Sequence, residues 1–162
     1  MEIKVVYGYR GYIMIIVNNE KYIVWKDSFN TGYKRIDGQH EKFLGMLNRL
    51  YEINDDKDLN NIKIREEFNS VLKDTIDYMV YHFRTEEDIM KAINYKNLIK
   101  HSSKHRDFSN KIFDEVKNYT ANNYIDIVSL ITYLRNWLFN HILIEDKAFV
   151  YELKAILKKT DN

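Results

Sequence analysis

From Asp37 to near the end of the chain, apolar residues recur at three- and four-residue steps, the period of an α-helix with one buried face. The 162 residues include no proline, so long helices can run without a break. The pattern starts at Asp37, breaks at the polar loop 54–61, and resumes over about 62–93, 96–119 and 125 to near the C-terminus. Long amphipathic helices with short connections predict an all-α, up-down-up-down four-helix bundle.

The first two dozen residues follow a different pattern. Three short β-branched and aromatic runs occur there, IKVVY, GYIMIIV and KYIVW, and Asn18-Asn19 between the last two suits a tight turn. This pattern predicts a short N-terminal β-hairpin or meander. We therefore expect a β-like extension over residues 1–24 and a helical bundle over 25–162. The extension either covers the bundle or offers a strand edge to a second chain.

The charge balance argues against two classes of partner. Lysine and arginine number 25 and aspartate and glutamate 24, which gives no electrostatic case for binding nucleic acid or an acidic membrane. The apolar run at 12–17 is too short to span a bilayer, and the N-terminus lacks the features of a signal peptide. We therefore expect a cytoplasmic protein. The sequence leaves its oligomeric state open.

Histidines lie on or beside the apolar stripe of each predicted helix. The five are His40, His82, His101, His105 and His141. His82 and Glu86 are four residues apart, as are His101 and His105, so each pair faces one direction on a helix. A single histidine on an apolar face is more often a satisfied core residue than a metal ligand. Burying five imidazoles without partners is costly, however, and a shared cation explains why all of them face inward.

His141 and Asp146 are five residues apart, which matches an ordinary α-helix poorly. Two interpretations are open at this point. Asp146 either faces away from the histidines, or the helix widens into a π-type turn, in which positions i and i+5 align.

The number and kind of donors indicate more than one ion. The chain has no cysteine, so any metal must be held by histidine, aspartate and glutamate. Five imidazoles and two carboxylates are too many for one ion and suit two, and imidazole-rich sites favour iron, copper or nickel over magnesium or calcium. The Glu-x-x-His motif that the usual di-iron carboxylate bundle uses twice is absent.

The order of these residues resembles that of the hemerythrin family, specifically the single-domain bacteriohemerythrins. The matching motifs are His40 at the end of WKDSFNTGYKRIDGQH, then HFRTE, HSSKH and NWLFNHILIED, and the resemblance extends from about Trp25 to Leu157. The spacing of His141 and Asp146 is the family's own.

The resemblance implies a non-haem centre of two iron ions joined by an oxo or hydroxo bridge. His101, His105 and His141 would complete one iron, and His40 and His82 would hold the other. Glu86 and Asp146 would bridge the two ions. This count leaves one coordination position free on the iron with two histidines, where dioxygen would bind.

The function implied is reversible oxygen binding for storage, delivery or buffering, with an oxygen-requiring enzyme as one recipient and no catalytic residues. The alternatives are a di-iron enzyme that reduces nitric oxide or peroxide, and an oxygen or redox sensor. Apolar residues are expected to surround the ligands, which favours a small neutral gas and hinders proton delivery. The expected pocket residues are Trp25, Phe43, Phe83, Trp137, Leu138 and Ile142.

Overall fold

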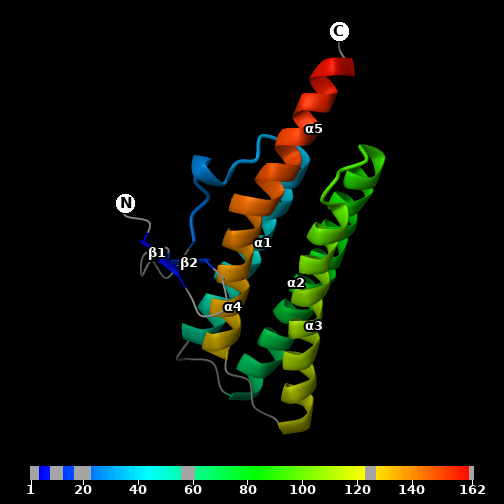
Figure 1. The fold of residues 1–162 in the computed structure, drawn as a ribbon. Coiled ribbons are helices and arrows are strands. Elements are labelled where there is room, and N and C mark those ends of the chain that lie inside the picture. Colours follow the sequence, from blue (N-terminus) through cyan, green and yellow to red (C-terminus); the bar gives the residue numbers. More distant parts are fainter. Residues whose placement is uncertain (1–3, 8–12, 17–22, 56–60, 123–126, 161–162) are drawn as a thin grey trace.

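The computed structural model describes residues 4–7, 13–16, 23–55, 61–122 and 127–160. Most of these residues are helical, as the periodicity predicts. The long helices are α1 (Lys34–Asp55), α2 (Asn61–Ala92), α3 (Leu98–Asn122) and a fourth rod made of α4 (Ile127–Asn140), a π-helical turn η2 (His141–Asp146) and α5 (Lys147–Thr160). They lie lengthwise beside one another, with α2 next to α3 (Figure 1). None of the described helices is long and apolar enough to cross a membrane.

Two short strands precede the helices. Strand β1 (Lys4–Tyr7) pairs antiparallel with β2 (Ile13–Ile16), and β2 lies against α4 (Figure 1). The expected turn at Asn18-Asn19 lies outside the described residues. Ile23–Trp25, the described part of the third run, is not a strand. Asn48 of α1 instead fixes this segment, because its side chain both accepts a hydrogen bond from the Ile23 amide at 2.8 Å and donates one to the Ile23 carbonyl at 2.9 Å.

Helix α1 begins at Lys34, about one turn before the predicted start, because the Asp37 side chain in its first turn binds the backbone of the loop before the helix. Its Oδ1 accepts hydrogen bonds from the Thr31 amide and hydroxyl, both at 2.7 Å, and its Oδ2 accepts one from the Gly32 amide at 3.1 Å. Gly32 has φ of +84°, a conformation that glycine adopts without strain. This capping leaves Asp37 in the first turn, so His40 lies in the second turn of the helix.

A tight reversal joins α2 to α3. Asn94 has φ of +52°, and the Tyr95 amide donates to the Met90 carbonyl at 2.9 Å while the Asn94 amide donates to the Lys91 carbonyl at 3.1 Å. These two bonds form a Schellman cap, and Tyr95 and Met90 supply its usual apolar contact. The reversal returns the chain along α2, which places the HSSKH motif opposite HFRTE.

The core has two apolar clusters along the length of the bundle. The larger includes Phe83 of α2 and Ile142 of the fourth rod, and the smaller includes Met90 and Phe149 of the same two elements. Glu86 and Asp146 lie between these cluster residues in sequence on each helix. A layer of buried polar side chains therefore separates the two clusters.

Candidate metal centre

Helix α2 presents the first pair of the polar layer from an uninterrupted α-helix. His82 and Glu86 lie one turn apart, and both are buried, Glu86 completely. Oε2 of Glu86 is 3.7 Å from Nε2 of His82. The i,i+4 spacing thus brings an imidazole and a carboxylate to one place, as the sequence predicts.

Helix α3 presents the second pair toward the same carboxylate. His101 and His105 are buried, and each ring places its Nε2 3.3 Å from Oε2 of Glu86. His141, from the fourth rod, places its Nε2 3.8 Å from that oxygen. One oxygen of Glu86 therefore faces ring nitrogens from three helices.

The fourth rod brings Asp146 into the layer because it widens at His141–Asp146. These six residues form a π-helical turn, which confirms the second of the two interpretations of the five-residue spacing. Asp146 is completely buried, with Oδ1 3.2 Å from Nε2 of His141 and 3.4 Å from Nε2 of His101. Its Oδ2 lies 3.0 Å from Nε2 of His40, on α1. In an ordinary α-helix this side chain would point away from His141.

The seven predicted ligands form two groups within which the candidate ligand atoms lie no more than 4.8 Å apart. We define the three-histidine group as Glu86, His101, His105 and His141. The two-histidine group is His40, His82, Glu86 and Asp146. Glu86 belongs to both groups. The structure thus brings together every metal-binding candidate that the sequence singled out, and it divides the histidines into three and two as the resemblance implies, although Asp146 belongs to one group only.

Burial favours the neutral form of four of the imidazoles by lowering their pKa values. It lowers the pKa of His105 to about 2, and it lowers the pKa of His82 and His141 well below the usual value, with neighbouring imidazoles adding to the effect. Burial also lowers the pKa of His101, although Asp146 opposes this shift. A neutral imidazole carries the lone pair that a metal ion requires.

Burial shifts the pKa of the Glu86 carboxylate in the opposite direction from the pKa of the histidines. Burial, followed by the charge of Asp146, raises the pKa of Glu86 well above its usual range. Two carboxylates in a dry layer repel each other unless positive charge lies between them. The four buried imidazoles with lowered pKa values do not supply that charge, because they are neutral.

The hydrogen bonding of the layer fits bound cations. Among the described residues, several buried atoms of the ligand set have no hydrogen-bond partner, although buried polar groups are normally paired. They are both ring nitrogens of His40, Nε2 of His82, Nδ1 of His101, Oε1 of Glu86 and both carboxylate oxygens of Asp146. Most of these atoms are donors suited to imidazole- and carboxylate-binding metals, so the residues present fit the cations that the two groups could hold.

Two polar side chains that the sequence analysis did not single out contact the outer edges of the histidines. Oε1 of Gln39 lies 2.9 Å from Nδ1 of His82, and the Gln39 amide nitrogen donates to the Thr85 hydroxyl at 3.2 Å. Oε1 of Glu87 lies 3.0 Å from Nδ1 of His105. Each is adjacent in sequence to a predicted ligand, but a neighbouring position alone does not show which histidine a side chain reaches.

The predicted pocket residues divide between the two groups. Phe83 stacks on His105, with ring centroids 3.8 Å apart, and Trp137 stacks on His141 at 4.3 Å, so both lie against the three-histidine group. Trp25 is 6.5 Å from the His40 ring, beside the two-histidine group. Phe43, Leu138 and Ile142 are buried in the larger apolar cluster. The sequence did not identify Phe149, which lies 6.3 Å from the ring of His101.

Five histidines and two carboxylates from four helical rods define a class of helical bundle with two adjacent groups that could hold cations and that share Glu86. Comparisons with known proteins agree with this class. The family model for the hemerythrin HHE cation binding domain matches residues 31–153. The bacteriohemerythrin of Stenotrophomonas maltophilia is 31% identical over 137 residues, which cover 85% of each chain. The bacteriohemerythrin of Clostridium acetobutylicum is 28% identical over 134 residues, 78% of this chain and 98% of that protein.

The fold agrees with the sequence comparisons. A crystal structure of wild-type hemerythrin superimposes with a TM-score of 0.70 and 27% identity, covering 78% of this chain and 94% of that one. The chain belongs to the hemerythrin family.

Proposed function

We propose that this chain binds dioxygen reversibly at a non-haem di-iron centre, for storage, delivery or buffering of oxygen. In this proposal His101, His105 and His141 would hold one iron, His40 and His82 would hold the other, and Glu86 and Asp146 would bind both. Two iron ions joined by an oxo or hydroxo bridge would supply there the electrons and the coordination position that dioxygen requires. The bundle is up-down-up-down, and the N-terminal β-hairpin is an addition to it.

The observation that carries the proposal is the unequal division of histidines around shared carboxylates. The three-histidine group contains three imidazoles and Glu86, and the two-histidine group contains two imidazoles, Glu86 and Asp146. Oδ1 of Asp146 also lies 3.2 Å from Nε2 of His141 and 3.4 Å from Nε2 of His101, so Asp146 would give the ion of the three-histidine group a fifth protein ligand and leave the other ion with four. An ion with fewer protein ligands keeps a position for an external molecule, as catalytic and binding metal sites do. The family membership and the bacteriohemerythrin relatives support iron as the metal and oxygen as that molecule.

The surroundings of the two-histidine group favour binding over catalysis. Trp25 lies near His40, and the amide of Gln39 contacts His82. Neither side chain transfers protons near neutral pH, whereas reduction of peroxide or nitric oxide consumes protons. We therefore propose a carrier without enzymatic activity, located in the cytoplasm, that supplies dioxygen to an oxygen-requiring enzyme.

Reconstitution with ferrous iron under anaerobic conditions tests the proposal. We expect about two irons per chain, an absorption change on adding oxygen, and its reversal when oxygen is removed. Stopped-flow mixing with peroxide or nitric oxide should show no sustained turnover. One zinc per chain with no absorption change on oxygenation would contradict the proposal, and multiple turnovers of peroxide or nitric oxide would support the enzyme alternative.

A further inference from the structure

We propose that Glu87 is a positioning residue of the three-histidine group. Its carboxylate holds His105 so that Nε2 faces the cation, and the carboxylate thereby strengthens the binding of that cation. This inference rests on the two-cation centre proposed above, and it concerns a side chain that is not itself one of the seven ligands.

Two side chains of α2 hold His105 from outside the group. Phe83 lies nearly parallel to the imidazole, with an interplanar angle of 11° and centroids 3.8 Å apart, and Glu87 contacts the ring edge with Oε1 3.0 Å from Nδ1. Phe83 and Glu87 are four residues apart, like His82 and Glu86, but one position further along the helix. Helix α2 therefore presents ligands along one row and supports for His105 along the adjacent row.

The chemistry of the contact fixes the tautomer of His105. A carboxylate only accepts hydrogen bonds, so Nδ1 must carry the proton and donate to Glu87. In the neutral ring this leaves the lone pair on Nε2, which lies 3.3 Å from Oε2 of Glu86 and faces the group. A carboxylate behind a ligating histidine also makes the imidazole a stronger donor, and loss of such a partner typically weakens metal binding about 10- to 100-fold.

The other histidines provide an internal contrast. Nδ1 of His101, one turn before His105 on the same helix, has no hydrogen-bond partner among the described residues. Nδ1 of His82, in the two-histidine group, contacts a neutral amide, that of Gln39, rather than a carboxylate. Glu87 keeps access to solvent, with 27% of its side chain exposed, so its charge is tolerated at the edge of the layer. The two groups thus differ in the charge behind their histidines as well as in the number of histidines.

Titration of the cation-free protein with cobalt(II), followed by absorption and by competition with a chelator, tests the inference. We expect two binding steps in the wild-type chain. Glu87→Ala should weaken the tighter step about 10- to 100-fold. Glu87→Gln, which keeps an acceptor and removes the charge, should weaken it less. Gln39→Ala should act mainly on the other step, because it contacts the two-histidine group.

Asp88→Ala is the matched control, since Asp88 is the next acidic residue, is exposed, and pairs with Lys91 rather than with a histidine. It should leave both steps unchanged. If Glu87 only supports helix packing, its variants will lower the melting temperature of the cation-free protein and leave cobalt affinity within twofold of wild type, which overturns the inference while the centre stands. A wild-type chain that binds fewer than two cobalt ions overturns both the inference and the proposed centre.

Discussion

Two histidine–carboxylate pairs reach the centre from helices of different geometry. His82 and Glu86 are four residues apart on a regular α-helix, and His141 and Asp146 are five apart on a π-helical turn. The regular helix carries the longer carboxylate and the widened turn carries the shorter one. Both carboxylates nevertheless lie within 3.8 Å of ring nitrogens from more than one helix. Side-chain length and backbone geometry are therefore alternative ways to bring a carboxylate to the same layer.

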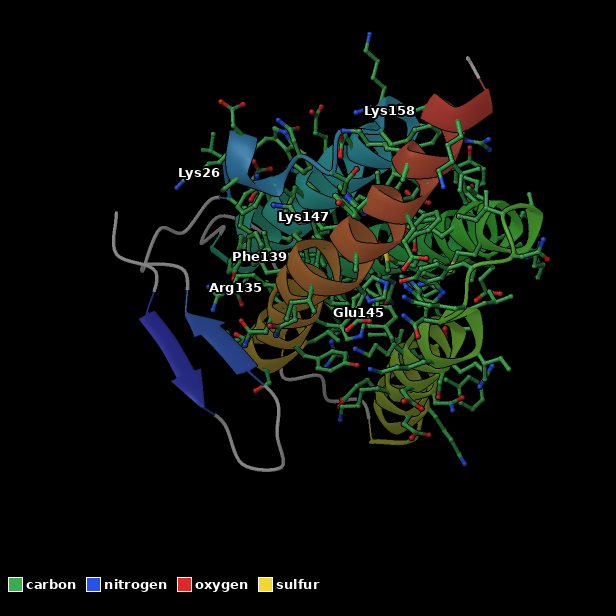
Figure 2. The ribbon with its side chains drawn as sticks, turned by 45° about the horizontal axis from the view of Figure 1, so that its top comes forward. Lys26, Arg135, Phe139, Glu145, Lys147 and Lys158 are labelled. Atoms are coloured by element: carbon green, nitrogen blue, oxygen red, sulfur yellow. The ribbon has the colours of Figure 1, made fainter. Side chains whose placement is uncertain are left out.

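The widened turn has a second consequence, on the surface beside the three-histidine group. Glu145, the residue before Asp146, lies on the side of the fourth rod that faces α3 (Figure 2). There it forms an ion pair with Lys104 of α3. The pair joins the π-helical turn to the helix that carries His101 and His105. We infer that this contact helps to hold the turn in register with α3.

The largest expected effect comes from neutralising the carboxylates, which compares the two pairs directly. Glu86→Gln should abolish binding of both cations because Glu86 belongs to both groups, whereas Asp146→Asn should abolish binding at the two-histidine group and only weaken it at the three-histidine group, which keeps three imidazoles and Glu86. Saturation at roughly 1,000 times the dissociation constant contributes about 4 kcal/mol of stability per cation, or about 8–16 °C in melting temperature for a chain of this size. Calorimetry with and without cation would measure this gain for each variant.

The same variants should behave differently without cation. Glu86 and Asp146 repel each other in the buried layer, so Glu86→Gln should raise the melting temperature of the cation-free protein. Asp77→Asn, at an exposed position of α2, is the control and should change neither form appreciably. Equal cation-dependent gains in wild type and Glu86→Gln would show that Glu86 is not a shared ligand.

A smaller but more specific effect should follow from removing the extra residue of the π-helical turn. Deleting Ile144, which is exposed, leaves His141 and Asp146 four residues apart, as on α2. The helix should become regular and keep the direction of α5, but the short side chain of Asp146 should fall short of the two-histidine group. We expect cation stoichiometry in a cobalt titration to fall from two toward one.

Lengthening the side chain should reverse that loss. Adding Asp146→Glu to the Ile144 deletion reproduces the combination found on α2, a glutamate on a regular helix, and should restore the second cation. The same substitution in the full-length chain should weaken binding, because the longer side chain overreaches from a widened turn. A deletion variant that still binds two cations with wild-type affinity would mean that the π-helical turn is not needed for reach.

The smallest expected effect concerns pH, where the two pairs should act alike. The folded-state pKa values of His82 and His141 are lowered by burial, so the unfolded chain takes up protons first as pH falls below about 6.5. Stability of the cation-free protein is therefore present above this pH and is lost on acidification, by up to about 1.4 kcal/mol per pH unit for each histidine. His82→Gln and His141→Gln should flatten the dependence between pH 7 and 5 by similar amounts.

Glu86 should act in the opposite direction over part of this range. Its folded-state pKa is raised, so its contribution favours the folded state at low pH and is lost as pH rises above about 4.5. Glu86→Gln should therefore steepen the acid loss that the histidines cause. Urea denaturation at several pH values would measure these slopes, and slopes equal to wild type in all three variants would contradict the assigned burial effects.

The sequence by itself determined the residues of the centre and most of the helices. The period of the apolar residues is a local property, so the positions of α1 to α3 and of the fourth rod followed from it to within a few residues. The i,i+4 pairs followed from the geometry of one helix, and the order of the motifs identified the family. The division into residues 1–24 and 25–162 stays a prediction.

The tertiary structure decided the contacts between helices. Periodicity shows which side of a helix is buried but not its rotation against a neighbour, so it could not assign Glu87 to His105 or Gln39 to His82. It also left the direction of Asp146 open, because the five-residue spacing is compatible with a regular α-helix and with a π-helical turn, and these two geometries point Asp146 in different directions. The fourth rod adopts the π-helical turn, and this turn brings Asp146 within reach of His40 on α1 as well as its own His141.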